Sequence, residues 1–147
     1  MSLIERLDSD MKDALRGRDR VRLETIRGIR GAIRNKEIEL GKTLDADGVV
    51  RVIRGLAKQR AESIEQYRAA GRDDLADKES AEKAVLESYL PAAPDQAEIE
   101  RVVREVMAES GATGAKDMGR VMKPALERLG PAADGKLVSQ VVRRLLA

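Results

Sequence analysis

The sequence predicts an all-α protein with an N-terminal helical domain of long helices, residues 1–90, and a small C-terminal three-helix domain, residues 91–147. Aliphatic residues recur every three or four positions along most of the 147-residue chain. Phe and Trp are absent and Tyr occurs twice, whereas 37% of the residues are charged, a composition typical of long helices. No stretch alternates apolar and polar residues as a half-buried strand would.

Four helices are expected before residue 91. Ser2 and Glu5 form a capping box for the first helix, which ends at Gly17. Asp19 can cap the second, whose apolar stripe runs to Gly41. The third and fourth helices are expected over about residues 46–70 and 74–89, each beginning at an aspartate and separated by a glycine.

A second face of the expected second helix is narrow, because it consists of Gly28, Gly31 and Ala32. A glycine inside a helix costs about 1 kcal/mol relative to alanine. We therefore expect a neighbouring backbone to pack closely against this face.

Pro91 and Pro94 interrupt any helix and mark the boundary between the two domains. Asp95 begins a fifth helix, and apolar residues at helical spacing predict two more, over residues 118–129 and 135–146. Pro124 lacks an amide proton, so it should kink the sixth helix near Arg120 or restart it.

Composition excludes several kinds of chemistry. The chain has no His and no Cys, so it cannot form a cysteine nucleophile, a Ser-His-Asp triad or an ordinary zinc site. We expect no catalytic residue, no metal and no cofactor. The N-terminus has no apolar run long enough for a signal peptide or a membrane span. Together with the absence of Cys, this predicts a cytoplasmic protein that does not bind a membrane.

The net charge of +2 conceals segregation by helix. Residues 16–36 contain eight basic and two acidic residues, and residues 116–144 contain seven and three. Residues 73–87 and 95–109 are acidic, with two basic residues each against six and five acidic ones. Each domain therefore has one acidic and one basic part.

Two sets of cations are candidate phosphate contacts. The first is an RNA-binding patch in the C-terminal domain: Lys116, Arg120, Lys123, Lys136, Arg143 and Arg144. The second is a secondary basic face on the second helix: Arg20, Arg27, Arg30 and Arg34. This second face could instead pair with the acidic fourth helix within the same molecule.

Four segments follow one another in the order “KQRAESIEQYRAAGRDDLADKE”, “YLP”, “DMGRVM” and “ADGKLVSQVV”. Together they resemble the YqeY-like family, whose members are similar to the tail domain of the GatB subunit of glutamine-dependent aspartyl/glutamyl-tRNA amidotransferase. The resemblance implies a C-terminal domain like the part that grips tRNA, without the catalytic domain of that enzyme. It also implies structural turns at Asp117, Gly119, Asp134 and Gly135, in which Asp117 caps a helix, Met118 packs and Gly119 admits a backbone.

Three functional hypotheses follow. The first is a non-catalytic, tRNA-associated module that binds RNA by shape and backbone charge. The second is a protein-interaction module that docks on a tRNA-modifying, aminoacyl-tRNA synthesis or amidotransferase complex. The third is a carbon–nitrogen ligase with glutamine as amide donor.

Overall fold

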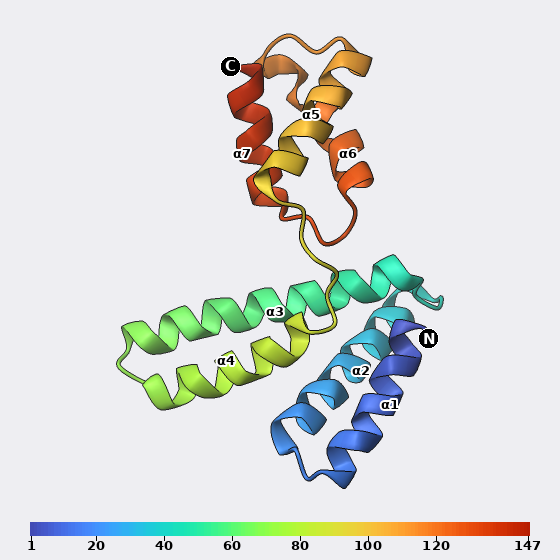
Figure 1. Cartoon of the computed structure of the whole chain (residues 1–147), viewed down its shortest axis with the longest axis vertical. Helices are drawn as coiled ribbons and strands as arrows, with labels where there is room; N and C mark the ends of the chain where they lie inside the picture. The colour runs from blue at the N-terminus through green and yellow to red at the C-terminus, as the bar shows by residue number, and fades with distance from the viewer. The chain divides into compact units, whose positions relative to one another are not determined.

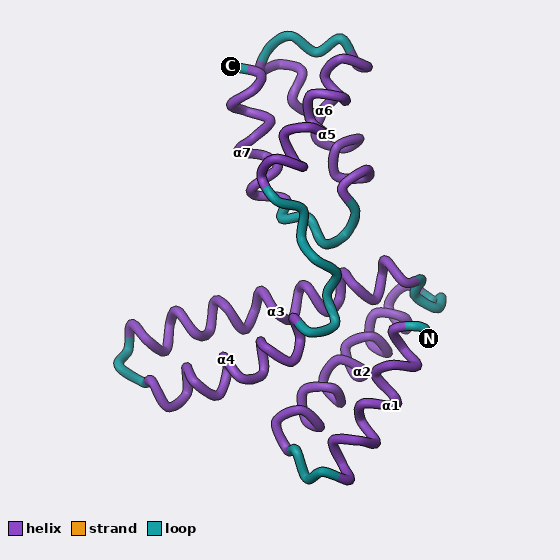
Figure 2. Tube along the Cα trace, viewed as in Figure 1, coloured by secondary structure: helices purple, strands orange, loops and turns teal.

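The structure is a computed structural model that describes residues 1–147, and it contains helices and loops but no strand (Figure 2). This confirms the predicted all-α class. The elements are α1 Leu3–Arg16, α2 Arg20–Leu40, α3 Ala46–Ala69, α4 Asp73–Glu87, α5 Gln96–Ser110, the 3₁₀ turn η1 Ala115–Asp117, α6 Met118–Leu129 and α7 Gly135–Leu146. None of the helices is both long and apolar enough to cross a membrane.

The chain divides into two compact units, Met1–Leu90 and Pro91–Ala147. The N-terminal unit consists of two helical hairpins, α1 with α2 and α3 with α4 (Figure 1). Its buried core is aliphatic apart from one tyrosine: Leu7, Ile26, Ile29, Ile33, Val49, Ile53, Ala57, Leu86 and Tyr89. Tyr67, the other tyrosine of the chain, is only half-buried.

Aspartate side chains begin several helices as the sequence predicts. The Asp19 side chain accepts a hydrogen bond from the amide of Arg22, and Asp45 accepts one from the amide of Gly48. The α2 helix ends at Gly41, which has a φ of 69°. Residues with a side chain rarely adopt this conformation, so glycine fits the end of the hairpin.

The close packing expected at the narrow face of α2 is absent. A Cβ atom added to Gly28 or Gly31 would meet no atom within 4 Å. Gly28 and Gly31 remain helical because the opposite, apolar face of α2 packs in the core, where Ile26, Ile29 and Ile33 are buried. The two glycines therefore lie on open surface, and no packing contact within the molecule requires a residue without a side chain there.

The acidic α4 pairs with α3 and not with the basic face of α2. Arg60 Nε lies 3.2 Å from Glu79 Oε2 and 2.8 Å from Glu82 Oε2, and Arg68 Nη2 lies 3.3 Å from Asp77 Oδ1. The pairing of α2 with α4 that charge alone suggested is thus wrong, because the arginines of the adjacent hairpin arm are nearer.

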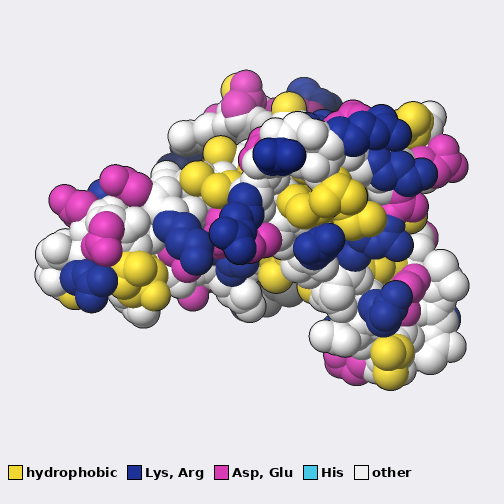
Figure 3. All heavy atoms as spheres, turned by 90° about the horizontal axis from the view of Figure 1, so that it is seen from below, with side chains coloured by type: hydrophobic (Ala, Val, Ile, Leu, Met, Phe, Trp, Pro, Cys, Tyr) yellow, Lys and Arg dark blue, Asp and Glu magenta, His cyan; other side chains and the backbone are white.

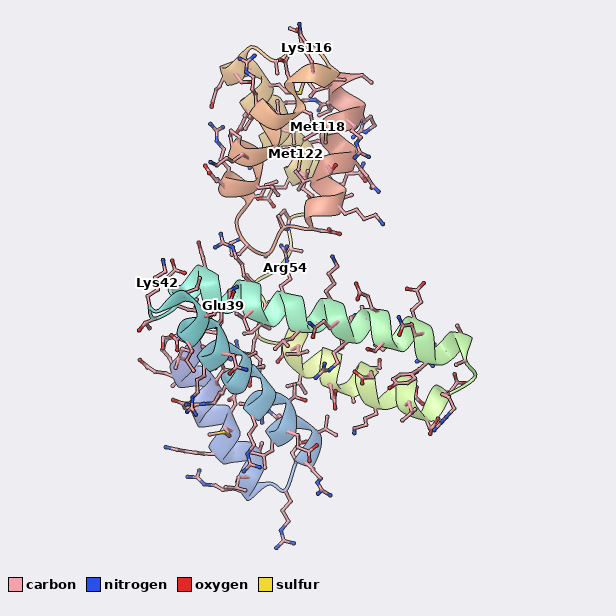
Figure 4. All side chains as sticks on the ribbon, turned by 180° about the vertical axis from the view of Figure 1, so that it is seen from behind. Glu39, Lys42, Arg54, Lys116, Met118 and Met122 are labelled. Atoms are coloured by element: carbon pink, nitrogen blue, oxygen red, sulfur yellow. The ribbon has the colours of Figure 1, made fainter.

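The C-terminal unit packs α5, α6 and α7 around its own core. The buried members are Ile99, Val102, Val103, Val106, Ala112, Val121, Ala125, Ala133, Val138, Val141, Val142 and Leu146. Met118 and Met122 on α6 pack against this core, as the resemblance implied for Met118 (Figure 4). Asp134 begins α7 by accepting a hydrogen bond from the amide of Lys136.

The α6 helix continues through Pro124 without restarting. Neighbouring Val121 and Ala125 are fully buried, so core packing holds the turn that contains the proline. Of the two outcomes expected at Pro124, a kink near Arg120 or a restart of the helix, the restart does not occur. One backbone hydrogen bond, from position 124 to the carbonyl of Arg120, is necessarily missing.

Candidate nucleic-acid interface

The six cations proposed for RNA binding separate into two groups. Arg120 and Arg144 form salt bridges inside the C-terminal unit, with Asp117 and Glu100 respectively. The other four side chains form no salt bridge: Lys116, Lys123, Lys136 and Arg143. All four are exposed, and Lys116 lies at the outer edge of this unit in Figure 4.

The α7 helix offers the clearest pair of free cations. Lys136 and Arg143 are seven residues apart, about two turns or ~10.5 Å along the helix axis, and therefore project from the same side. The opposite side of α7 is buried through Val138 and Val142. Lys136 and Arg143 thus face solvent because the apolar residues between them face the core.

Cations from both neighbouring helices pair with carboxylates of the acidic α5. Arg144 of α7 bonds to Glu100, and this hydrogen bond lowers the pKa of the Glu100 carboxyl. Arg128 of α6 bonds to Glu109, and that bond lowers the pKa of Glu109. Sequence spacing alone does not identify this role of Arg128, because spacing along one helix does not reveal a partner on another.

Asp117 stabilises a loop and does not cap α6. Its Oδ2 accepts a hydrogen bond from the amide of Thr113 at 3.0 Å, and its Oδ1 lies 3.3 Å from Arg120 Nη1. The bond from Thr113 is the main cause that lowers the pKa of Asp117. Arg120 also donates to the carbonyl oxygen of Ser110. Arg120 therefore connects the end of α5 to the turn before α6, while its side chain stays 61% exposed.

The two glycines of these turns have open surroundings. A Cβ at Gly119 or at Gly135 would meet no atom within 4 Å. The close backbone approach implied for Gly119 by the resemblance is therefore absent from this structure.

The secondary basic face on α2 is also divided. Arg20 Nε lies 3.3 Å from Glu24 Oε1 on the same helix, and Arg30 pairs with Asp8 of α1. Arg27 and Arg34 are exposed and have no salt bridge. On the face of the molecule drawn in Figure 3, Lys and Arg side chains border hydrophobic patches and alternate with acidic ones.

No group of three or more Asp and Glu side chains is arranged so that it could hold a metal ion. The C-terminal unit is a small helical module in which most carboxylates of α5 are paired with arginines, while α6 and α7 carry free cations. Such a surface can bind anions through charge without base-specific contacts.

The family described as Yqey-like protein matches residues 4–146. The chain therefore belongs to the YqeY-like family, as its motifs suggested.

Relatives of the chain share one name, Altered inheritance of mitochondria protein 41, mitochondrial. The protein of Pyrenophora tritici-repentis is 30% identical over 98% of this chain and 81% of its own length. That of Lachancea thermotolerans is 35% identical over 72% of this chain and 58% of its own length. That of Kluyveromyces lactis is 39% identical over 62% of this chain and 50% of its own length. The matches to the latter two thus span 58% and 50% of those proteins.

The names of these relatives contradict the cytoplasmic location predicted from the sequence. That prediction depended on the absence of Cys and of an apolar N-terminal run. Neither feature distinguishes the cytoplasm from another compartment in which disulfides are not needed.

Proposed function

We propose that this chain is a non-catalytic, tRNA-associated module whose C-terminal unit binds backbone phosphates of a folded RNA. The observation that carries the proposal is the set of cations on α6 and α7 without an internal salt bridge, Lys123, Lys136 and Arg143. Lys116, at the turn before α6, adds a fourth positive charge to this unit. Membership of the YqeY-like family, with its resemblance to the tail of a tRNA amidotransferase, supports RNA as the ligand.

Recognition would depend on shape and charge. Both tyrosines of the chain belong to the N-terminal unit, so α5, α6 and α7 offer no aromatic ring on which a base could stack. Phosphate contacts fix the register of a protein on a nucleic acid without reading its sequence. We therefore expect binding to different tRNAs with similar affinities.

A salt titration of total-tRNA binding tests the proposal. For the wild type, the logarithm of the binding constant should fall linearly with the logarithm of salt concentration. The variant Lys123→Glu/Lys136→Glu/Arg143→Glu should bind at least roughly tenfold more weakly, and the slope should decrease by about one for each lost phosphate contact.

The matched control changes the charge of the N-terminal unit by the same amount. Lys12→Glu/Lys42→Glu/Lys58→Glu replaces three exposed lysines that form no salt bridge. This control should bind tRNA nearly as well as the wild type. Equal losses in the two triple variants would mean that only net charge matters, and the absence of binding at low salt would reject the proposal.

The protein-interaction module is a second candidate function, and a groove in the N-terminal unit favours it. A partner protein would then dock there, and binding to a tRNA-modifying or amidotransferase complex would persist after charge reversal on α6 and α7. The third hypothesis, a glutamine-dependent carbon–nitrogen ligase, predicts glutaminase activity in the pure protein.

A further inference from the structure

An open groove runs between α1 and α2 in the N-terminal unit, with a volume of about 410 Å³. Its floor is apolar and consists of Ile4, Leu7, Met11 and Ile33. Leu7 and Ile33 are buried, whereas Ile4 is 39% exposed. The apolar part of the groove that remains in contact with water therefore belongs mainly to Ile4 and Met11.

Arginines line the α2 side of this groove. Arg27, Arg30 and Arg34 all contribute to its wall. Arg30 pairs with Asp8 of α1 across the groove, but Arg27 and Arg34 form no salt bridge. The second carboxylate of the lining, Glu37, already accepts a hydrogen bond from the amide of Leu44 at 2.8 Å. Two positive charges are therefore left without a partner beside an apolar floor.

The groove has the length of a helical ligand. Arg27 and Arg34 are separated by two helical turns, ~10.5 Å, and the lining on α2 extends from residue 27 to residue 37, ~15 Å. Carboxylates seven residues apart on another helix have the same ~10.5 Å spacing. Gly31 lies between the two free arginines and adds no side chain, which keeps the groove open.

We propose that the α1–α2 groove binds an acidic amphipathic helix of a partner protein, whose aliphatic side chains cover the floor while its carboxylates pair with Arg27 and Arg34. This mode combines apolar anchors at helical spacing with charge pairs at the rim. It also gives the glycine at position 31 a role that packing within the chain does not.

RNA fits this groove less well than a helix does. No aromatic side chain lines the groove, so bases would have no ring on which to stack. Phosphates alone would neutralise the arginines but leave the floor exposed to water.

A second copy of this chain is also a poor occupant. Its acidic helices α4 and α5 already use carboxylates in internal pairs, such as Glu82 with Arg60, Glu100 with Arg144 and Glu109 with Arg128. These pairs would have to break before either helix could serve the groove. A separate protein with free carboxylates has no such cost.

The test uses the full chain and two synthetic helical peptides of about 14 residues, ~21 Å long. Both carry leucines along one face, and one carries glutamates seven residues apart where the other carries glutamines. Fluorescence anisotropy of the labelled peptides should show that the glutamate peptide binds roughly tenfold more tightly. Equal binding of the two peptides, or no binding of either at low salt, would overturn the proposal.

Protein variants locate the binding. Arg27→Glu/Arg34→Glu should weaken binding of the glutamate peptide by roughly tenfold or more. Gly31→Leu should block the groove, whereas Gly28→Leu adds the same side chain to the same helix at a position outside the groove. Circular dichroism should show unchanged helix content in both glycine variants. Similar affinities of the two glycine variants would contradict the proposed site.

Two further measurements separate the rival occupants. An oligoadenylate that displaces the glutamate peptide from the wild type, and loses this ability in Arg27→Glu/Arg34→Glu, would assign the groove to RNA. A concentration-dependent dimer that Gly31→Leu abolishes in sedimentation would assign it to a second copy. Either result would overturn the partner-helix proposal, and neither depends on the RNA proposal for the C-terminal unit.

Discussion

At the scale of single residues, the most unusual polar group of the N-terminal core is the Tyr89 hydroxyl. Tyr89 is 4% exposed, and its O–H donates a hydrogen bond of 2.6 Å to Asp10 Oδ2. The guanidinium of Arg6 lies 4.7 Å from the centre of the Tyr89 ring. This buried ring thus connects α1 with the residues that follow α4 through a polar contact as well as through packing.

Burial raises the pKa of Tyr89 from 10.0 to about 12, and the hydrogen bond and negative charge of Asp10 contribute in the same direction. The neutral phenol is therefore favoured in the folded state. Its contribution to stability is present below pH 10 and should be lost as the pH rises from 10 towards 12.

The Tyr67→Phe variant isolates this titration, since Tyr89 is then the sole tyrosine and the chain has no Trp. Near-ultraviolet absorbance of tyrosinate should show a midpoint near pH 12. Asp10→Asn in the same background should lower the midpoint, because it removes the negative charge. A midpoint near 10 in the folded Tyr67→Phe protein would contradict the effect of burial.

At the scale of elements, the helices contain glycines that no contact explains. Gly28 in α2 and Gly55 in α3 are exposed, and a Cβ at either position would meet no atom within 4 Å. Gly41 differs, because its φ of 69° ends α2 in a conformation that side chains disfavour. Substitutions at Gly28 and Gly55 therefore test helix propensity, whereas a substitution at Gly41 tests the left-handed backbone conformation.

Replacement of these glycines by alanine should have opposite effects. Gly28→Ala and Gly55→Ala should each raise the free energy of unfolding by up to about 1 kcal/mol, through helix propensity. Gly41→Ala should lower it by about 1–2 kcal/mol, through left-handed strain. Denaturant unfolding of the three variants measures both signs. Loss of stability in Gly28→Ala would contradict the open surroundings of Gly28 on α2.

At the scale of the whole molecule, each unit has a core of its own. Ile53 is fully buried in the core of Met1–Leu90, and Ile99 is fully buried in that of Pro91–Ala147. Both tyrosines lie in the N-terminal unit. Tyrosine fluorescence therefore reports one unit, whereas far-ultraviolet circular dichroism reports the helices of both.

Separate cores predict separate effects of core mutations. Ile99→Ala should destabilise the C-terminal unit by about 2–5 kcal/mol, because it removes buried methyl groups and leaves a cavity. Thermal unfolding by circular dichroism should then gain an early phase without a change in tyrosine fluorescence. Ile53→Ala should shift the tyrosine transition. Coincident shifts of both signals in Ile99→Ala would show that the units unfold as one.

Local sequence was sufficient for much of the fold. Aliphatic spacing predicted the helices, and the aspartates Asp19, Asp95 and Asp134 marked where three of them begin, because helix periodicity and caps depend on residues close in the chain. The family followed from four short motifs. The sequence also identified every cation of the candidate RNA surface by residue type.

Only the tertiary structure decided which of those cations are free. Arg144 is bound to Glu100, which lies 44 positions earlier in the chain, whereas Arg143 beside it faces solvent. Asp117 likewise accepts a hydrogen bond from the amide of Thr113 in the loop and does not cap the helix that it precedes. Charge pairing depends on distance in space, and neighbouring helices determine that distance. The sequence by itself therefore determined the helices and the family, while packing determined the surface that remains for a ligand.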